Sequence, residues 1–325
     1  MKIAIIGLGR IGDLVLLTSI IKPLKKRFPN CKIYFIVGSS NHFVLANNPD
    51  VEDVLIFDKN PLKLIPFLLK LKKNKFDYYI DIKDHYSTES NIIAQLANAK
   101  IKIGFNDKNR NSPTFDIGIA SKSENLELHF VERIANILQQ IDINNLNNNS
   151  IEKMRPSLYI DRAEQKFIDN FLHSNNISNF ILVNISASDN SRMWQIEKWI
   201  ELVNYIKKDK MVIISSAPIH SDTVNEICKT TISPDTSVIH FPPSKLMLIS
   251  ALILRADLLI SPDTSVIHIA SAFDIPVISL TSNIRDNIIK FYPLSSNSEV
   301  IFPKNENETV EKIEVETVLH KLKNF

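Results

Sequence analysis

The beginning of the chain combines a glycine-rich turn with a carboxylate. An apolar run, residues 3–6, is followed by Gly7, Gly9 and Gly12, which are three of the protein's six glycines, and then by Asp13. A carboxylate at the start of a helix is stabilised by the helix dipole and stays ionised, so it can act as a base. We therefore expect this turn to carry chemistry. The simpler alternative is that Asp13 only caps the first helix.

The same glycines match the G-x-G-x-x-G fingerprint, in which small residues let a pyrophosphate approach a helix N-terminus. Two features argue against a nicotinamide cofactor. The charge of Asp13 beside the last glycine would repel a pyrophosphate. The second predicted strand, 31–37, also runs into Gly38-Ser39-Ser40 rather than into the acidic residue that holds a ribose. An NAD-dependent oxidoreductase is therefore the weaker enzyme hypothesis.

Length and composition predict two domains of a soluble globular protein. The chain has 325 residues, of which 44% are hydrophobic and 23% charged, and this length is large for a single core. The net charge of +2 gives no nucleic-acid-binding footprint. The two cysteines, Cys31 and Cys228, indicate neither a disulfide framework nor a metal cluster. With no signal peptide or membrane-spanning segment recognisable, we expect a cytoplasmic protein.

Strand-like and helix-like segments alternate along the chain, which is typical of parallel sheets covered by helices. The polar, asparagine-rich stretch 142–156 has the composition of a linker. We therefore predict an α/β protein with two doubly wound Rossmann-like domains, 1–155 and 156–325, that face a cleft. The predicted strands are 2–7, 31–37, 53–57, 78–82, 100–105, 180–186, 211–216, 236–241, 257–261 and 276–281. The predicted helices are 14–28, 61–75, 87–98, 161–175, 195–208, 220–230, 244–255, 264–273 and 307–323, the last packing back across the domain junction.

The sequence Ile-Ser-Pro-Asp-Thr-Ser-Val-Ile-His occurs twice, at 232–240 and at 260–268. Prolines follow the first copy and predict a strand there, whereas residues at helical spacing follow the second copy. We expect Asp263 and Thr264 to lie at the N-terminal end of that helix. Only the second copy then forms an anion site, and the role of the first copy stays open.

The order and spacing of several short motifs are specific as a set. The motifs are Gly9-Arg-Ile-Gly-Asp13 and the helix after it with Pro23 and Pro29; Ile80-Asp-Ile-Lys83 with Ser90; Ile103-Gly-Phe105; His129-Phe-Val-Glu-Arg133; Ser186 to Trp194 with Lys198-Trp199; and Arg255 to His268. Together they resemble the heptosyltransferases of lipopolysaccharide core assembly, family nine of the glycosyltransferases, which have the two-domain GT-B fold. The resemblance spans nearly the whole chain.

The resemblance implies inverting transfer of a heptose from ADP-heptose to a lipid-linked sugar acceptor, with the acceptor on the first domain and the donor on the second. Asp13 would be the general base. Inversion requires the acceptor hydroxyl to attack from the face opposite the leaving diphosphate, and a carboxylate within reach removes its proton. Gly12 and Arg10 would bind the acceptor, Arg10 as a contact for an acidic sugar.

The departing nucleoside diphosphate needs donors and cations, and the resemblance places these in two segments of the second half. The first is the loop with Ser186, Ser188 and Arg192, where hydroxyls, backbone N–H groups and a guanidinium can converge on phosphates. The alternative is a solvated polar loop. Arg192 stands where the family commonly has a lysine.

The second segment of the donor site is Asp263-Thr264-Ser265 with His268, whose hydroxyls and helix N-terminus would hold phosphate or ribose. His268 could equally be a buried packing residue. We interpret Trp194 and Trp199 as core residues rather than as platforms for sugar stacking.

Two departures from the family pattern concern the choice of nucleotide and the activity. Ser265 stands where the family usually has a glycine, and a positive φ there would strain a serine. Ile219 stands where relatives usually have a glutamate that holds the ribose, so His220 or Asp222 would have to replace it. The alternatives are therefore a transferase that uses another nucleotide sugar and an inactive sugar-nucleotide-binding relative.

Helix 61–75 mixes an apolar stripe with lysines at 63, 70, 72, 73 and 75. It could rest on anionic lipid headgroups at the inner face of the inner membrane, or it could be an ordinary crossover helix. The chain contains no D-x-D pair, so we expect no metal and no other cofactor.

Overall fold

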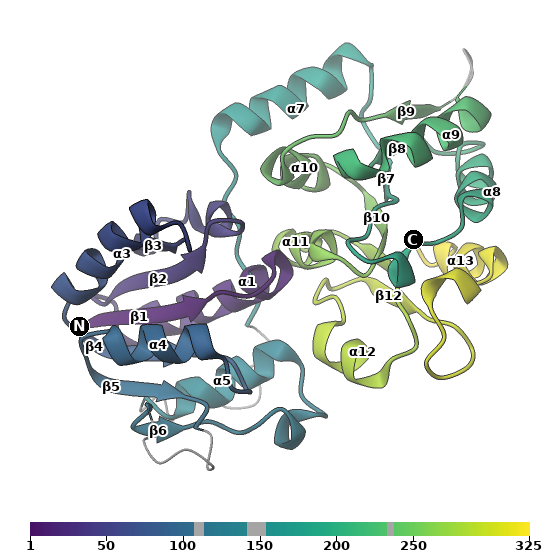
Figure 1. Cartoon of the computed structure of the whole chain (residues 1–325). Coiled ribbons are helices and arrows are strands. Elements are labelled where there is room, and N and C mark those ends of the chain that lie inside the picture. Colours follow the sequence, from purple (N-terminus) through teal and green to yellow (C-terminus); the bar gives the residue numbers. More distant parts are fainter. Residues whose placement is uncertain (107–113, 142–153, 233–236) are drawn as a thin grey trace. The chain divides into compact units, whose positions relative to one another are not determined.

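The computed structural model describes residues 1–106, 114–141, 154–232 and 237–325. The chain divides into two compact units, Met1–Tyr159 and Ile160–Phe325 (Figure 1). Each unit consists of a six-stranded sheet with helices on its faces. Among the described residues, the helices are too short or too polar to cross a bilayer.

The sheet of the first unit is entirely parallel, with the strand order β3-β2-β1-β4-β5-β6. Its strands are β1 Lys2–Gly7, β2 Lys32–Gly38, β3 Val51–Phe57, β4 Phe76–Asp81, β5 Ala99–Gly104 and β6 Ile117–Gly118. Its helices are α1 Ile11–Leu17, α2 Ile21–Arg27, α3 Pro61–Lys73, α4 Thr88–Leu96 and α5 Phe130–Gln139, with short 3₁₀ turns η1 Thr18–Ile20, η2 His42–Leu45 and η3 Ser123–Asn125.

The first helical segment begins earlier than predicted and is divided in two. α1 starts at Ile11, which places Asp13 in its first turn, and the 3₁₀ turn η1 separates it from α2. Pro23 lies in the first turn of α2, and because proline has no backbone N–H it cannot continue the hydrogen-bond ladder of α1. The prediction of one helix over 14–28 was therefore wrong in its bounds and its continuity.

The end of the predicted linker belongs to the first unit. Residues 142–153 lie outside the described residues, but Met154 and Leu158 are buried. The Ser157 N–H donates a hydrogen bond of 2.8 Å to Oγ1 of the buried Thr18. These contacts explain why the first unit extends to Tyr159, slightly beyond the boundary expected after residue 155.

The sheet of the second unit is also parallel and repeats the same topology, with the order β12-β11-β10-β7-β8-β9. Its strands are β7 Ile181–Asn184, β8 Val212–Ser215, β9 Val238–His240, β10 Leu258–Pro262, β11 Val277–Leu280 and β12 Ser298–Ile301. Its helices are α7 Arg162–Ser174, α8 Ile196–Ile206, α9 Ser221–Thr231, α10 Leu246–Ile253, α11 Ser265–Phe273, α12 Arg285–Phe291 and α13 Val315–Leu322, with 3₁₀ turns η4 Asn190–Arg192, η5 Pro218–His220 and η6 Val310–Lys312.

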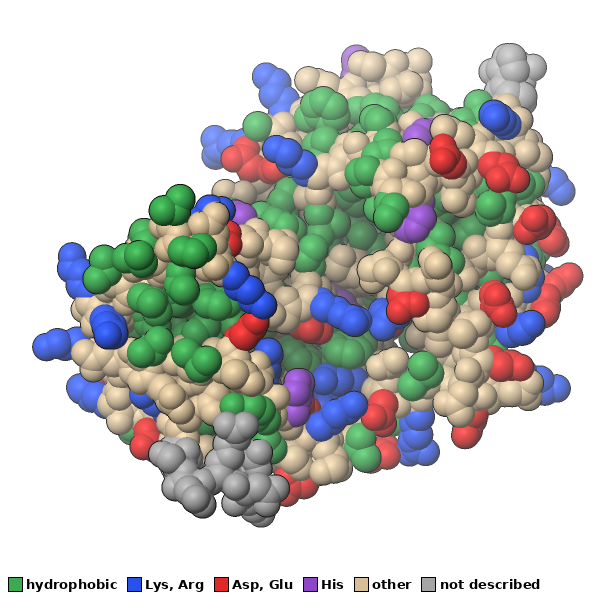
Figure 2. Space-filling view, viewed as in Figure 1, with side chains coloured by type: hydrophobic (Ala, Val, Ile, Leu, Met, Phe, Trp, Pro, Cys, Tyr) green, Lys and Arg blue, Asp and Glu red, His purple; other side chains and the backbone are tan. Residues whose placement is uncertain are grey.

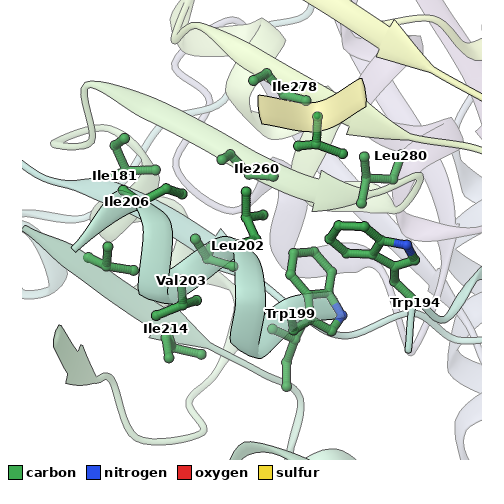
Figure 3. Close-up of a cluster of buried hydrophobic side chains, with 14 of the residues drawn as sticks. Ile181, Trp194, Trp199, Leu202, Val203, Ile206, Ile214, Ile260, Ile278 and Leu280 are labelled. Atoms are coloured by element: carbon green, nitrogen blue, oxygen red, sulfur yellow. The ribbon is translucent and has the colours of Figure 1, made fainter. Parts of the chain in front are cut away.

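Trp194 and Trp199 are core residues, as predicted. They are 3% and 0% exposed, and their rings meet edge to face with centroids 4.9 Å apart. Figure 3 shows them beside the aliphatic side chains of β7, β8, β10 and α8. The Trp194 indole N–H also donates to the Ile313 carbonyl at 2.9 Å, so this core fixes the segment before the last helix.

The C-terminal segment differs from its prediction. In place of one helix over 307–323 there are the turn η6 and the shorter helix α13. α13 contacts α8, β11 and β12, and its Val315 and Val318 are buried in the core of the second unit. The apolar face of α13 is thus used within its own unit, and the packing of this helix across the domain junction stays a prediction.

The two copies of the repeated sequence form different structures. Residues 233–236 of the first copy lie outside the described residues, and the copy ends in strand β9. The second copy forms the end of β10 and the first turn of α11, with Thr264 at the N-cap position. The strand predicted at the end of the first copy and the helix predicted from the second copy are both confirmed.

Candidate functional site

The strand order of each unit reverses next to its first strand, and open α/β sheets bind ligands at such switch points, beyond the carboxyl ends of the strands. In the first unit the switch point lies between β1 and β4, and in the second between β7 and β10. The segments from which site residues were predicted follow β1, β7 and β10. The topology therefore places one group of candidate residues at the switch point of each unit.

Asp13 occupies the third position of α1 and is half-buried. Its Oδ2 accepts a hydrogen bond of 3.1 Å from the backbone N–H of Arg10, the N-cap residue. Arg10 itself is exposed, and Gly12 is buried within the same helical turn. The carboxylate therefore does cap the helix, and its position beyond the end of β1 is fixed by that bond.

Two residues, Gly9 and Asn41, determine how the glycine-rich turn lies beside Asp13. A Cβ atom on Gly9 would lie 2.8 Å from Oδ2 and 3.2 Å from Cβ of Asp13, so a larger residue there would displace the Asp13 carboxylate. The amide of Asn41, which is 1% exposed, donates to the carbonyls of Gly7 and Gly9 at 3.1 and 3.0 Å. Sequence reasoning missed Asn41, because a lone asparagine after a strand carries no signal of a long-range contact.

A second carboxylate, Asp81, ends β4 on the other side of this switch point, where it is 3% exposed. It accepts hydrogen bonds from the Ser90 hydroxyl and, at 3.0 Å, from the Lys83 backbone N–H. Burial raises the pKa of the Asp81 carboxyl, and these hydrogen bonds lower it only in part. Ile6 of β1 is paired with Asp81 in the sheet, so the residue belongs to the same edge as the Gly9 turn.

In the second unit, Ser186 follows β7 and connects it to the loop after β8. Its Oγ accepts a hydrogen bond of 2.7 Å from the Ala217 N–H and lies 3.0 Å from Nδ1 of His220. The side chain of Asn184, at the end of β7, donates to the Ser186 carbonyl at 3.1 Å and to Oγ of Ser261 at 2.9 Å. Ser186 is thus held by neighbours on both sides, whereas Ser188 is exposed.

Arg192 joins the loop after β7 to the loop after β10. Its Nη1 donates to the Asp263 carbonyl at 3.0 Å and lies 3.4 Å from Oδ2 of Asp263. A guanidinium has five N–H donors, and these contacts use only Nη1. The side chain is 24% exposed, so it is anchored at one end and can still offer donors to an anion. The two predicted segments of the donor site are therefore brought together.

The segment after β10 contributes a helix N-terminus. Thr264 is the N-cap residue, and its Oγ1 is buried without a hydrogen bond within the described part of the chain. Ser265 is the first residue of α11 and has no positive φ, so a serine is accommodated there without backbone strain. His268 lies on the buried side of α11, 5% exposed, with its ring 6.0 Å from that of Phe291.

The position expected to hold the ribose is occupied by Ile219, an apolar residue whose side chain is 85% exposed. His220, next to it, contacts Ser186, and Asp222 lies in the first turn of α9. Among the described residues, no three His, Cys, Asp or Glu side chains are grouped as metal ligands would be. The arrangement offers hydroxyls, one guanidinium and a helix N-terminus, which are groups suited to binding an anion.

Comparison with known proteins finds relatives by sequence and by structure. Residues 66–321 match the family model of glycosyltransferase family 9 (heptosyltransferase). The lipopolysaccharide core heptosyltransferase OpsX of Haemophilus influenzae is 23% identical in an alignment 351 positions long, which covers 99% of this chain and 96% of that protein.

Two solved structures share the fold. The glycosyltransferase family 9 protein of Veillonella parvula superposes with a TM-score of 0.83 at 16% identity, over 99% of this chain and 96% of the other. The Escherichia coli ADP-heptose lps heptosyltransferase II gives a TM-score of 0.78 at 17% identity, over 100% of this chain and 98% of the other. They confirm the prediction of two doubly wound Rossmann-like domains of the GT-B type.

Proposed function

The chain belongs to glycosyltransferase family 9, the heptosyltransferases, and we propose that it transfers a heptose from ADP-heptose to a lipid-linked sugar of the lipopolysaccharide core, with inversion. That it is a glycosyltransferase follows from the family. The donor, the acceptor and the mechanism are the proposal. The observation that carries it is Arg192, which joins the loops after β7 and β10 at the switch point of the second unit.

In the proposed donor site, the second unit stabilises the charge of the leaving diphosphate. The unused N–H donors of Arg192, the hydroxyls of Ser186, Ser188 and Ser265, and the N-terminus of α11 surround the ends of β7 and β10. Preorganised hydrogen-bond donors aimed at a developing negative charge are the usual means by which an enzyme lowers the activation barrier of such a transfer. Thr264 adds a buried hydroxyl that has no hydrogen-bond partner among the described residues, and such a hydroxyl is suited to a phosphate or ribose oxygen. Asp263 fixes Arg192, and His268 supports the helix from its buried side.

In the proposed acceptor site, the first unit supplies the base. The Asp13 carboxylate accepts the proton of the attacking hydroxyl as the new glycosidic bond forms and the sugar–phosphate bond breaks. Its capping bond to the Arg10 N–H is compatible with this role, because it orients the carboxylate without protonating it. The exposed Arg10 side chain can pair with an acidic acceptor, whereas Gly12, the other residue proposed to bind the acceptor, is buried in the same turn. Because the acceptor is lipid-linked, we place the enzyme at the cytoplasmic face of the inner membrane.

ADP is the proposed nucleotide because one structural relative is described as an ADP-heptose transferase. The exposed Ile219 keeps two alternatives in consideration, a different nucleotide sugar and a binding protein without turnover. An NAD-dependent oxidoreductase is disfavoured, because the Asp13 carboxylate lies against Gly9, where a pyrophosphate would have to approach.

The test is calorimetric titration with ADP, UDP, GDP and NAD of the wild type and of Arg192→Ala. A charged hydrogen bond contributes about 1.5–3 kcal/mol, so we expect ADP to bind selectively and the variant to bind it about 10- to 100-fold more weakly. The control is Arg255→Ala, which removes a surface ion pair with Asp169 in the same unit and should leave ADP binding unchanged. Selective UDP or GDP binding would change the donor, whereas NAD binding, or no binding, would overturn the proposal.

A further inference from the structure

Helix α3 has more apolar surface than its own unit uses. It begins at Pro61, after the N-cap residue Asn60, whose side chain accepts a hydrogen bond from the Leu62 N–H, and it also contains Pro66. One face packs on the core of the first unit, with Phe67 and Leu71 buried and with Leu64 and Leu68 partly buried. These contacts are sufficient to attach the helix to the sheet as an ordinary crossover helix would be attached.

The opposite face of α3 presents a second apolar stripe. Leu62 is 83% exposed, Ile65 61% and Leu69 65%, and their spacing of three and four residues aligns them along one side of the helix. Ile92 on the adjacent helix α4 is also exposed. Single exposed apolar residues are common, but a contiguous group marks an interaction surface. Figure 2 shows this group of hydrophobic side chains over α3 and α4, with lysines around it.

The charges around this stripe are mostly positive. The lysines at its N-terminal end and along its length are balanced by acids, because Lys59 pairs with Glu89, Lys63 with Asp58, and Lys70 with Asp53. The C-terminal end of the helix is different. Lys72, Lys73 and Lys75 are exposed, and the ion pairs found among the described residues do not include them. Flexible lysines next to an apolar stripe can reach headgroups while the stripe enters the acyl boundary.

We propose that the outer face of α3, formed by Leu62, Ile65 and Leu69 with Lys72 and Lys73 at its end, docks the protein on an anionic lipid bilayer. The inference deepens the proposed function and rests on its lipid-linked acceptor. Charge complementarity selects the occupant, since a bilayer with anionic headgroups supplies both the apolar phase and the negative charge that this face lacks. A second copy of the chain would bring the same lysines together.

The experiment is co-sedimentation of the full chain with vesicles of phosphatidylglycerol and phosphatidylethanolamine, and with vesicles of phosphatidylcholine alone. We expect binding to the anionic vesicles, weakened by salt, and little binding to the neutral ones. Leu69→Glu should reduce the binding about tenfold, because it replaces an inserted apolar group by a charge of the wrong sign. The matched control is Phe167→Glu, which changes a residue that is 53% exposed on α7 and should not alter binding.

A second pair of variants tests the charges. Lys72→Gln with Lys73→Gln should weaken binding to anionic vesicles and reduce its salt dependence, whereas Lys208→Gln with Lys210→Gln, also exposed, should not. Equal binding to both kinds of vesicle, or binding unchanged in Leu69→Glu, would overturn the inference. So would self-association that Leu69→Glu abolishes without any vesicle binding. ADP titration of the same samples separates these results from failure of the proposed function, since donor binding does not require α3.

Discussion

Asp13 shows that a capping residue and a proposed base can be the same side chain. The hydrogen bond from the Arg10 N–H holds Oδ2, and the absence of a Cβ on Gly9 leaves room for the carboxylate against the turn. The two interpretations weighed from the sequence are therefore compatible. The capping role is observed in the structure, and the catalytic role remains a proposal that activity measurements must test.

Gly9→Ala should reduce turnover by about 100-fold while the protein stays folded. The added Cβ would lie 2.8 Å from Oδ2 of Asp13 and push the carboxylate aside, and a displacement of about 1 Å at a catalytic group costs on that order. Gly38→Ala is the control, because a Cβ there would meet no atom closer than 3.6 Å. Steady-state kinetics and ADP affinity would be measured together. Full activity in Gly9→Ala would show that the position of Asp13 is unimportant.

Asp81→Asn should change how stability depends on pH. Because burial raises the folded-state pKa of Asp81, the folded protein holds this proton to higher pH than the unfolded chain does. The contribution of Asp81 to the free energy of unfolding therefore falls as pH rises from about 3.9, the ordinary carboxyl pKa, through the raised folded-state pKa. Asparagine does not ionise, so the variant does not lose this stability. Across that pH interval its free energy of unfolding, measured by denaturant unfolding, should therefore rise relative to that of the wild type.

Asp77→Asn, in the same strand, provides the comparison of opposite sign. The hydrogen bonds from Lys100 and the Lys2 N–H lower the pKa of Asp77. Its contribution to folding stability is therefore present above the ordinary carboxyl pKa and is lost on acidification. This variant should therefore be less stable than wild type near neutral pH, and the difference should shrink in acid. The same pH response in both variants would contradict the environments described for the two carboxylates.

At the scale of elements, the sequence was a good guide where apolar runs are long and buried. The strands β1, β2, β4, β8, β10 and β11 lie within a few residues of their predictions, because strands covered on both faces are continuously apolar. The strands β6 and β12 and the helix α12 were not predicted. β6 and β12 are edge strands with few buried residues, and α12 has no fully buried side chain, so their sequences lack the apolar periodicity on which prediction depends.

Trp199→Ala should destabilise the second unit by about 3–5 kcal/mol, the usual cost of removing a large aromatic side chain from a core. Trp199 is fully buried and packs edge to face on Trp194, which in turn holds the segment before α13. Tyr205→Ala on the same helix removes an aromatic ring that is 41% exposed and should cost far less. Denaturant unfolding would measure both, and similar costs would contradict the described core.

At the scale of the whole molecule, the two units repeat one topology, and the proposed site residues lie at the switch point of each. The sequence could identify these loops because they come directly after buried strands. It could not identify Asn41 or Asn184, whose hydrogen bonds join segments distant in sequence or on neighbouring strands. It also could not show that Ser265 fits without strain, since this depends on where α11 begins.

The most direct test of the central proposal is heptose transfer from ADP-heptose to a lipopolysaccharide core acceptor by Asp13→Asn. Asparagine keeps an oxygen that can accept the Arg10 N–H bond but cannot take a proton at neutral pH, so turnover should fall about 10²- to 10⁴-fold with ADP affinity unchanged. Glu164→Gln is the matched control, because that carboxylate caps α7 through a bond of the same length, 3.1 Å, from the Asp161 N–H. Turnover that is equal in Asp13→Asn and wild type would contradict the role of Asp13 as the base.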